Sequence, residues 1–128
     1  MARIRDVVFD CRHPAPLARF WATALEGYAV APYDEAELDR LRAAGIDDPE
    51  DDPTVLVEPS SGNGPRLWFQ LVPEAKQVKN RVHLDLACAD VRAEVLRLAG
   101  LGARVLAEQQ AWVTMEDPEG NEFDVTPG

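Results

Sequence analysis

The chain has 128 residues, of which 46% are hydrophobic and 28% charged, a composition typical of one soluble globular domain. Its 23 acidic and 13 basic residues give a net charge of −10, which disfavours nucleic acid and anionic membranes as partners. The sequence has neither a membrane-length apolar run nor the cysteine content of a disulfide-based secreted domain, so we expect a cytoplasmic protein with reduced thiols.

The first half of the chain predicts a strand, a helix and then further strands. "DVVFDC" near residues 6–11 alternates as a strand does, and the apolar stripe of Leu17, Phe20 and Trp21 after two prolines predicts a helix. "GYAVAP" follows as a short strand, and "WFQLVP" at 68–73 closes the half as its last strand.

An insert separates these strands at about residues 34–53. Leu38, Leu41 and Ala44 are spaced as on a short amphipathic helix, and the acidic run "DDPEDD" follows. A cation site is one interpretation of that run. We favour a solvated loop, because the prolines break any regular spacing of ligands.

The second half of the chain repeats the order of elements. "NRVHLDLACAD" alternates as a strand over 81–88, with His83 and Asp85 on one face and aliphatic residues on the other. A helix near 90–100 ends at "GLG", and the strands "ARVLAE", "AWVTMED" and "EFDVTP" follow. The "DPEGN" turn connects the last two strands.

The two halves match at both ends, which indicates a tandem duplication. Aligning the opening strands places Asp6 over His83, and aligning the closing prolines of "WFQLVP" and "EFDVTP" places Gln70 over Asp124. We therefore predict one α+β domain over residues 1–128, built from tandem strand-helix-three-strand units. Unit one spans about 3–73, and unit two spans about 80–127.

The repeated unit resembles the vicinal oxygen chelate superfamily, which includes glyoxalases, extradiol dioxygenases and bleomycin-resistance proteins. "DPEGNEFDV" looks like that superfamily's closing turn and last strand, and "VPEAKQVKNRVHLDL" is similar to a stretch of small bacterial glyoxalase-like proteins. The resemblance covers the chain apart from the insert. It implies a curled mixed sheet around a cleft.

The resemblance also implies a metal site, with one ligand from the first and last strand of each unit. The matching positions are Asp6, Gln70, His83 and Asp124, and each lies opposite the aliphatic face of its strand. One nitrogen and three oxygen donors suit a divalent ion such as Mn, Fe, Co, Ni or Zn. The set departs from the family's usual histidines and glutamates, and a metal-free binding cleft is the alternative. No organic cofactor is expected.

Further residues on the same faces are candidates for contacts with a ligand. Trp68 shares a face with Gln70, and Trp112 and Thr114 would face the same side of their strand, so we expect these three side chains to bind ligand. Asp124 is also the candidate catalytic base. Glu122 is an alternative acid, although we favour a rim position for it.

Two functions follow as hypotheses, and both take a small molecule as partner. The first is a divalent-metal-dependent lyase or isomerase whose substrate chelates through vicinal oxygens. The second is a metal-free protein that sequesters a cationic, antibiotic-like ligand, as bleomycin-resistance proteins do. Because superfamily members commonly pair and open sheet edges invite association, we also predict a homodimer.

Overall fold

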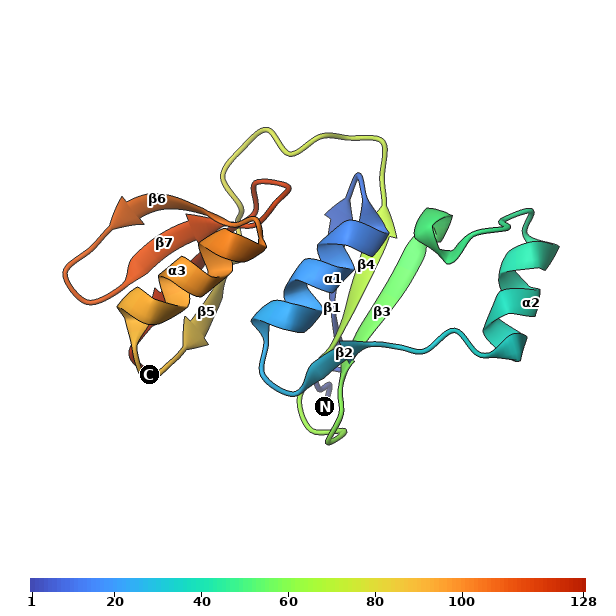
Figure 1. Cartoon of the computed structure of the whole chain (residues 1–128), viewed down its shortest axis with the longest axis horizontal. Helices are drawn as coiled ribbons and strands as arrows, with labels where there is room; N and C mark the ends of the chain where they lie inside the picture. The colour runs from blue at the N-terminus through green and yellow to red at the C-terminus, as the bar shows by residue number, and fades with distance from the viewer. The chain divides into compact units, whose positions relative to one another are not determined.

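The computed structural model describes all of residues 1–128 and divides into two compact units, Met1–Ala75 and Lys76–Gly128. Each unit has the strand-helix-three-strand order that the duplication predicts (Figure 1). The tandem α+β fold is therefore confirmed, with the strands arranged as two four-stranded mixed sheets. None of its helices has the length and apolar character needed to cross a membrane.

The first unit has the strand order β1-β4-β3-β2, in which β1 and β4 are parallel and the other pairs are antiparallel. Helix α1 starts at two prolines, packs against β2, β3 and β4, and covers one face of the sheet (Figure 1). The elements of this unit are β1 Asp6–Cys11, α1 Pro14–Ala24, β2 Tyr28–Val30, α2 Glu35–Ala43, the 3-10 helix η1 Pro49–Asp51, β3 Thr54–Pro59 and β4 Arg66–Leu71.

An aromatic cluster between α1 and the sheet forms the core of this unit. The ring of Phe9 lies 4.9 Å from that of Phe69 and 5.3 Å from that of Trp21, measured between ring centroids. Phe69 and Trp21 are fully buried, as are the alternate strand residues Val57 and Leu67. Burying alternate strand residues leaves the opposite face of the sheet to Asp6, Val8, Trp68 and Gln70, as the alternation predicts.

The insert forms the predicted helix, α2, but its acidic run is not simply solvated. Asp52 is buried, and its carboxylate accepts hydrogen bonds from the Tyr33 hydroxyl at 2.8 Å and from the Thr54 N–H at 3.0 Å. The Asp48 carboxylate accepts a hydrogen bond from the Glu50 N–H in the first turn of η1. The Glu50 carboxylate forms a bidentate ion pair with Arg19. These acids bind the insert to α1 and to the residues that flank it, which spacing alone does not reveal.

The second unit repeats the topology as β5-β8-β7-β6, again with parallel first and last strands. Its helix α3 begins at the cap Asp90, which accepts from Ala93 N–H, and ends at Gly102 with a φ of 118°. The elements of this unit are β5 Leu84–Ala87, α3 Val91–Leu101, β6 Arg104–Glu108, β7 Val113–Glu116 and β8 Glu122–Thr126.

Two strands of this unit begin later than the alternating pattern predicts. His83 was expected within a strand over 81–88, but β5 begins at Leu84. Its partner β8 begins at Glu122, directly after the Asp117–Asn121 turn, so the residues before Leu84 have no long ladder to join. Similarly, Trp112 precedes β7, which begins at Val113.

Replacing Phe69 tests the aromatic core. Phe69→Ala removes a fully buried ring between Phe9 and the neighbouring strands, and we expect it to lower the free energy of unfolding by about 3–5 kcal/mol. Val8→Ala, on the opposite face and 54% exposed, should change it by no more than about 0.5 kcal/mol. Urea unfolding followed by far-UV circular dichroism measures both variants. Equal losses would contradict this assignment of the two faces.

Candidate functional site

A histidine and two aspartates come together on one sheet face of the second unit. In the parallel β5–β8 pair, Asp85 lies opposite Asp124, and His83 is two residues before Asp85 on the same side. The Nε2 atom of His83 is 3.3 Å from Asp85 Oδ1 and 3.5 Å from Asp124 Oδ2. One donor atom from each residue lies within 4.8 Å of the other two.

Thr114 fixes the orientation of Asp124. These residues face each other across the antiparallel β7–β8 pair, and the Thr114 hydroxyl donates a hydrogen bond to Asp124 Oδ1 at 2.7 Å. This bond leaves Oδ2 directed at His83. The side chain of Asp124 is 18% exposed, whereas those of His83 and Asp85 are 44% and 63% exposed. A ligand can therefore reach the last two from solvent.

The corresponding face of the first unit has a different chemistry. Asp6 accepts two hydrogen bonds from Arg66, at 2.8 and 3.1 Å, and a third from Arg5 at 3.0 Å. The Arg66 guanidinium holds the pKa of the Asp6 carboxyl below its ordinary value of 3.8, against a smaller opposing effect of burial, and Arg5 lowers it further. Its charge is thus already compensated by protein groups.

The pairing register shows which positions of the two units are equivalent. The thiol of Cys11 donates to the Gln70 carbonyl, and the thiol of Cys88 donates to the Thr126 carbonyl. Superposing the cysteines therefore sets Gln70 on Thr126, whereas the closing prolines had set it on Asp124. The strands retain their pairing, but β4 runs two residues further than β8 before its proline, so the two alignments differ by two residues.

In this register Trp68 takes the place of Asp124. Val8 lies opposite Trp68 just as Asp85 lies opposite Asp124, and Leu56 flanks Trp68 as Thr114 flanks Asp124. The first unit thus carries an apolar row across β1, β4 and β3 where the second carries oxygen donors. Arg66 lies 5.7 Å from the centroid of the Trp68 ring.

The structure therefore brings only part of the predicted site together within one unit. His83, Asp124 and Thr114 meet in the second unit, where the Thr114 hydroxyl binds Asp124. In the first unit Asp6 pairs with Arg66, and Gln70 lies opposite Asp10. Trp112, which directly precedes β7, is 41% exposed.

Asp85 joins the cluster, although the sequence pattern did not predict it to be a ligand. The signal for Asp85 was present, because an acid two residues after a histidine shares its strand face. The family pattern, which takes one ligand from each strand, had assigned the position to His83 alone.

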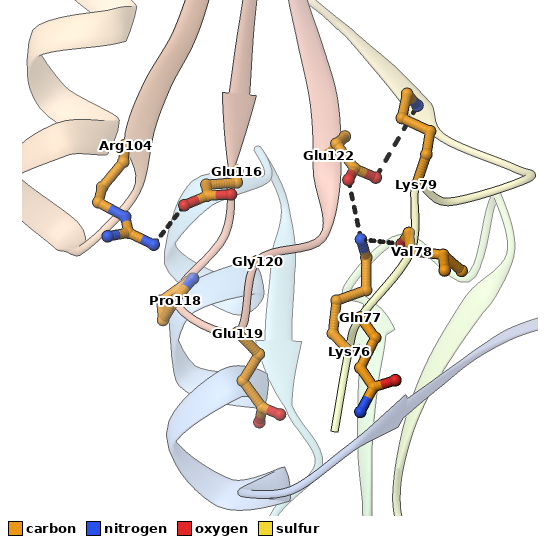
Figure 2. Close-up of a pocket in the computed structure, with 10 residues that line it drawn as sticks. All are labelled: Lys76, Gln77, Val78, Lys79, Arg104, Glu116, Pro118, Glu119, Gly120 and Glu122. Atoms are coloured by element: carbon orange, nitrogen blue, oxygen red, sulfur yellow. Dashed lines mark hydrogen bonds and ion pairs between the residues drawn. The ribbon is translucent and has the colours of Figure 1, made fainter. Parts of the chain in front are cut away.

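A hollow of about 550 Å³ also lies in the second unit, and the histidine and the two aspartates are not among its lining residues (Figure 2). Its wall includes the segment 76–79, the turn before β8, and Glu122. Arg104 forms an ion pair with Glu116 on one side of it. Glu122 was expected at a rim, and instead its side chain is only 11% exposed and bound to Lys76.

The family described as "Glyoxalase-like domain" matches residues 6–126 by its sequence profile. None of the curated proteins matches this chain in sequence.

Solved structures share the fold at low identity. The fosfomycin resistance protein FosX from Mesorhizobium loti has a TM-score of 0.66 at 9% identity, over 100% of this chain and 93% of its own. An enzyme of the glyoxalase/bleomycin resistance protein/dioxygenase family from Burkholderia phytofirmans PsJN has a TM-score of 0.64 at 14% identity, over 97% of this chain and 97% of its own. The trypanothione-dependent glyoxalase I of Leishmania major has a TM-score of 0.62 at 15% identity, over 98% of this chain and 86% of its own.

The Asp6–Arg66 pair gives a prediction about pH. Because the folded-state pKa of Asp6 is lowered, its contribution to stability is complete above the unfolded value of 3.8 and is lost as the pH falls through the folded value. Carbon-13 NMR of the Asp6 carboxyl should give a midpoint below 3.8, and Arg66→Met should raise that midpoint. An unchanged midpoint in Arg66→Met would show that the pair does not control Asp6.

Proposed function

We propose that this chain, which belongs to the glyoxalase-like domain family of the vicinal oxygen chelate superfamily, is a divalent-metal-dependent lyase or isomerase. The family match over residues 6–126 confirms the resemblance drawn from the sequence. The substrate class is a small molecule that chelates through neighbouring oxygens. The proposal rests above all on the convergence of His83, Asp85 and Asp124 on one face of one sheet.

The three donors suit the chemistry of a transition ion. They offer one imidazole nitrogen and two carboxylates, a combination that Mn, Fe, Co, Ni and Zn accept. Ligands bound to one ion at about 2.0–2.2 Å lie roughly 3 Å apart. His83 Nε2 already lies 3.3 and 3.5 Å from the two aspartate oxygens, so small side-chain adjustments suffice.

The first unit's candidates, Asp6 and Gln70, differ in how available they are. Asp6 would have to release Arg66 and Arg5 before its carboxylate could serve a metal, which costs it three charge-assisted hydrogen bonds. Gln70 is exposed and keeps a carboxamide oxygen to offer. We therefore build the proposed site on the second unit and keep both residues in the substitution series that tests it.

Asp124 is the proposed proton-transfer group. When bound, the metal would supply Lewis acidity to the substrate oxygens. Thr114 holds one oxygen of Asp124 by its 2.7 Å hydrogen bond, which fixes the direction of the other oxygen. The oxygen that Thr114 does not hold would serve the ion or, once the substrate has displaced it from the ion, would accept a proton from an adjacent carbon in a defined geometry.

A second candidate function is metal-free binding of a cationic, antibiotic-like molecule. The apolar row of Val8, Trp68 and Leu56 favours it, because an aromatic side chain on an open sheet face can stack on a planar ligand. The net charge of −10 favours a cation for such a ligand. In this alternative His83 acts as a hydrogen-bonding group.

Metal content separates the two functions. Protein purified without an affinity tag should hold, or take up, one equivalent of Mn, Fe, Co, Ni or Zn, measured by elemental analysis after dialysis. His83→Ala should abolish this binding because it removes the imidazole nitrogen, and Asp85→Asn should weaken it at least about tenfold because it replaces a charged carboxylate with a neutral carboxamide. Both variants should keep the wild-type far-UV spectrum, since the two side chains are exposed.

His13→Ala is the matched control, because it removes the chain's other histidine without touching the cluster. It should bind metal as the wild type does. Asp6→Asn and Gln70→Ala test the first unit, and loss of stoichiometric metal in either adds that residue to the ligand set. A wild-type protein that takes up none of the five ions would contradict the lyase or isomerase function and leave metal-free binding.

We also propose a homodimer. Strand β6 is one of the two edge strands of the second sheet, and its residues Val105 and Leu106 are 44% and 49% exposed. Exposed apolar residues on an edge strand favour association with a second copy. Sedimentation at micromolar concentration should give twice the 14.1 kDa of the chain, and Val105→Lys should shift the protein towards the single-chain mass. A monomer at all concentrations would contradict the dimer.

A further inference from the structure

The chain just before β5 has no regular structure of its own. Residues 76–83 contain neither helix nor strand, and β5 pairs with β8 only from Leu84 onward. Pairing of the backbone with β8 therefore does not hold His83, although His83 is the first of the three candidate metal ligands. Its position depends on the contacts that the segment makes elsewhere.

Glu122 makes those contacts from the start of β8 (Figure 2). Its Oε1 atom accepts a hydrogen bond from Lys76 Nζ at 2.8 Å, and its Oε2 atom accepts one from the Asn80 N–H at 2.9 Å. Lys79 Nζ lies 3.8 Å from Oε2, and Lys76 also donates to the carbonyl of Val78. One carboxylate thus binds both ends of residues 76–80.

The Glu122 side chain is itself well fixed. Burial alone would raise its pKa, but the hydrogen bonds from Lys76 and from the Asn80 N–H lower the pKa overall, so the carboxylate is charged. The turn before it is built on the buried Asp117, whose side chain accepts from Glu119 N–H at 2.9 Å and from Asn121 N–H at 3.0 Å. Glu122 therefore projects from a rigid part of the sheet.

The register of the β5–β8 pair places Glu122 next to the three candidate metal ligands. Leu84 pairs with Phe123, so the residue before each, His83 and Glu122, meets at the same end of the two strands. Asp124 follows Glu122 by two residues on the same face. We propose that Glu122 is a positioning residue, which holds the segment 76–80 against β8 and thereby keeps the His83 imidazole directed at Asp85 and Asp124.

The first unit supports this assignment by position. Superposed through the cysteines, Arg66 takes the place of Glu122, and Asp6 takes the place of His83. Arg66 binds Asp6 directly through two hydrogen bonds. In both units, then, the first residue of the last strand fixes the chain that begins the first strand.

The imidazole tautomer reports this positioning without any metal. Ionised carboxylates only accept hydrogen bonds, so we expect a neutral imidazole whose Nε2 lies 3.3 and 3.5 Å from two of them to carry its proton on Nε2. In metal-free protein at mildly alkaline pH, two-bond proton–nitrogen NMR should show this single tautomer for His83. His13 provides an internal reference in the same spectrum.

Glu122→Gln should convert His83 to a mixture of both tautomers, because the amide nitrogen must face a donor and one anchor of the segment is lost. Glu116→Gln is the matched control. Glu116 lies opposite Glu122 in the sheet, but its ion pair is with Arg104 on β6. Lys76→Met removes one hydrogen bond to Glu122 without altering β8, and it should shift the His83 tautomers in the same direction by a smaller amount. This variant tests the proposal even if Glu122→Gln folds poorly.

A second measurement is metal affinity by calorimetry with Mn²⁺, and this arm rests on the proposed function. Glu122→Gln should weaken binding about tenfold and Glu116→Gln should not, as expected for a group that orients a ligand. If the wild type binds no metal but Glu122→Gln still changes the His83 tautomer, the proposed function is overturned and the positioning role of Glu122 stands. An unchanged His83 tautomer in both Glu122→Gln and Lys76→Met, or an equal change in Glu116→Gln, overturns the positioning role.

Discussion

The parallel pairing of the first and last strand in each unit is the constraint on which the site depends. Parallel pairing fixes which residues of two distant segments face each other, and it sets Asp85 opposite Asp124 although 39 residues separate them along the chain. The same pairing sets Val8 opposite Trp68 in the first unit. A helix covers the other face of each sheet, so these residues are left on the open face.

The duplication has produced two faces of unlike chemistry on one topology. Equivalent register positions carry His83, Asp85 and Asp124 in the second unit, and Asp6, Val8 and Trp68 in the first. The buried positions diverge much less, because Phe69 and Leu67 and their counterparts Val125 and Phe123 must all fill a core. An internal repeat can in this way keep its fold while one copy retains polar donors and the other becomes apolar.

Much of the fold could be predicted from the sequence, because alternation and helical stripes directly reflect which side chains are buried. The order of elements, the insert helix and the open faces are confirmed. The site was harder, since a two-residue difference in register is invisible in a pattern of period two. Aligning the closing prolines preserved the faces and still paired Gln70 with the wrong position. Hydrogen bonds such as Glu122 to Lys76 join residues 46 apart and leave no periodic signal.

We propose that the open sheet face of the second unit binds a divalent ion through His83, Asp85 and Asp124. Anomalous diffraction at the manganese edge, from crystals grown with Mn²⁺, tests it most directly because it locates the ion independently of any activity. We expect one strong peak at about 2.0–2.3 Å from His83 Nε2 and from one oxygen of each aspartate. A peak bound by other residues, or no peak at saturating Mn²⁺, would contradict it.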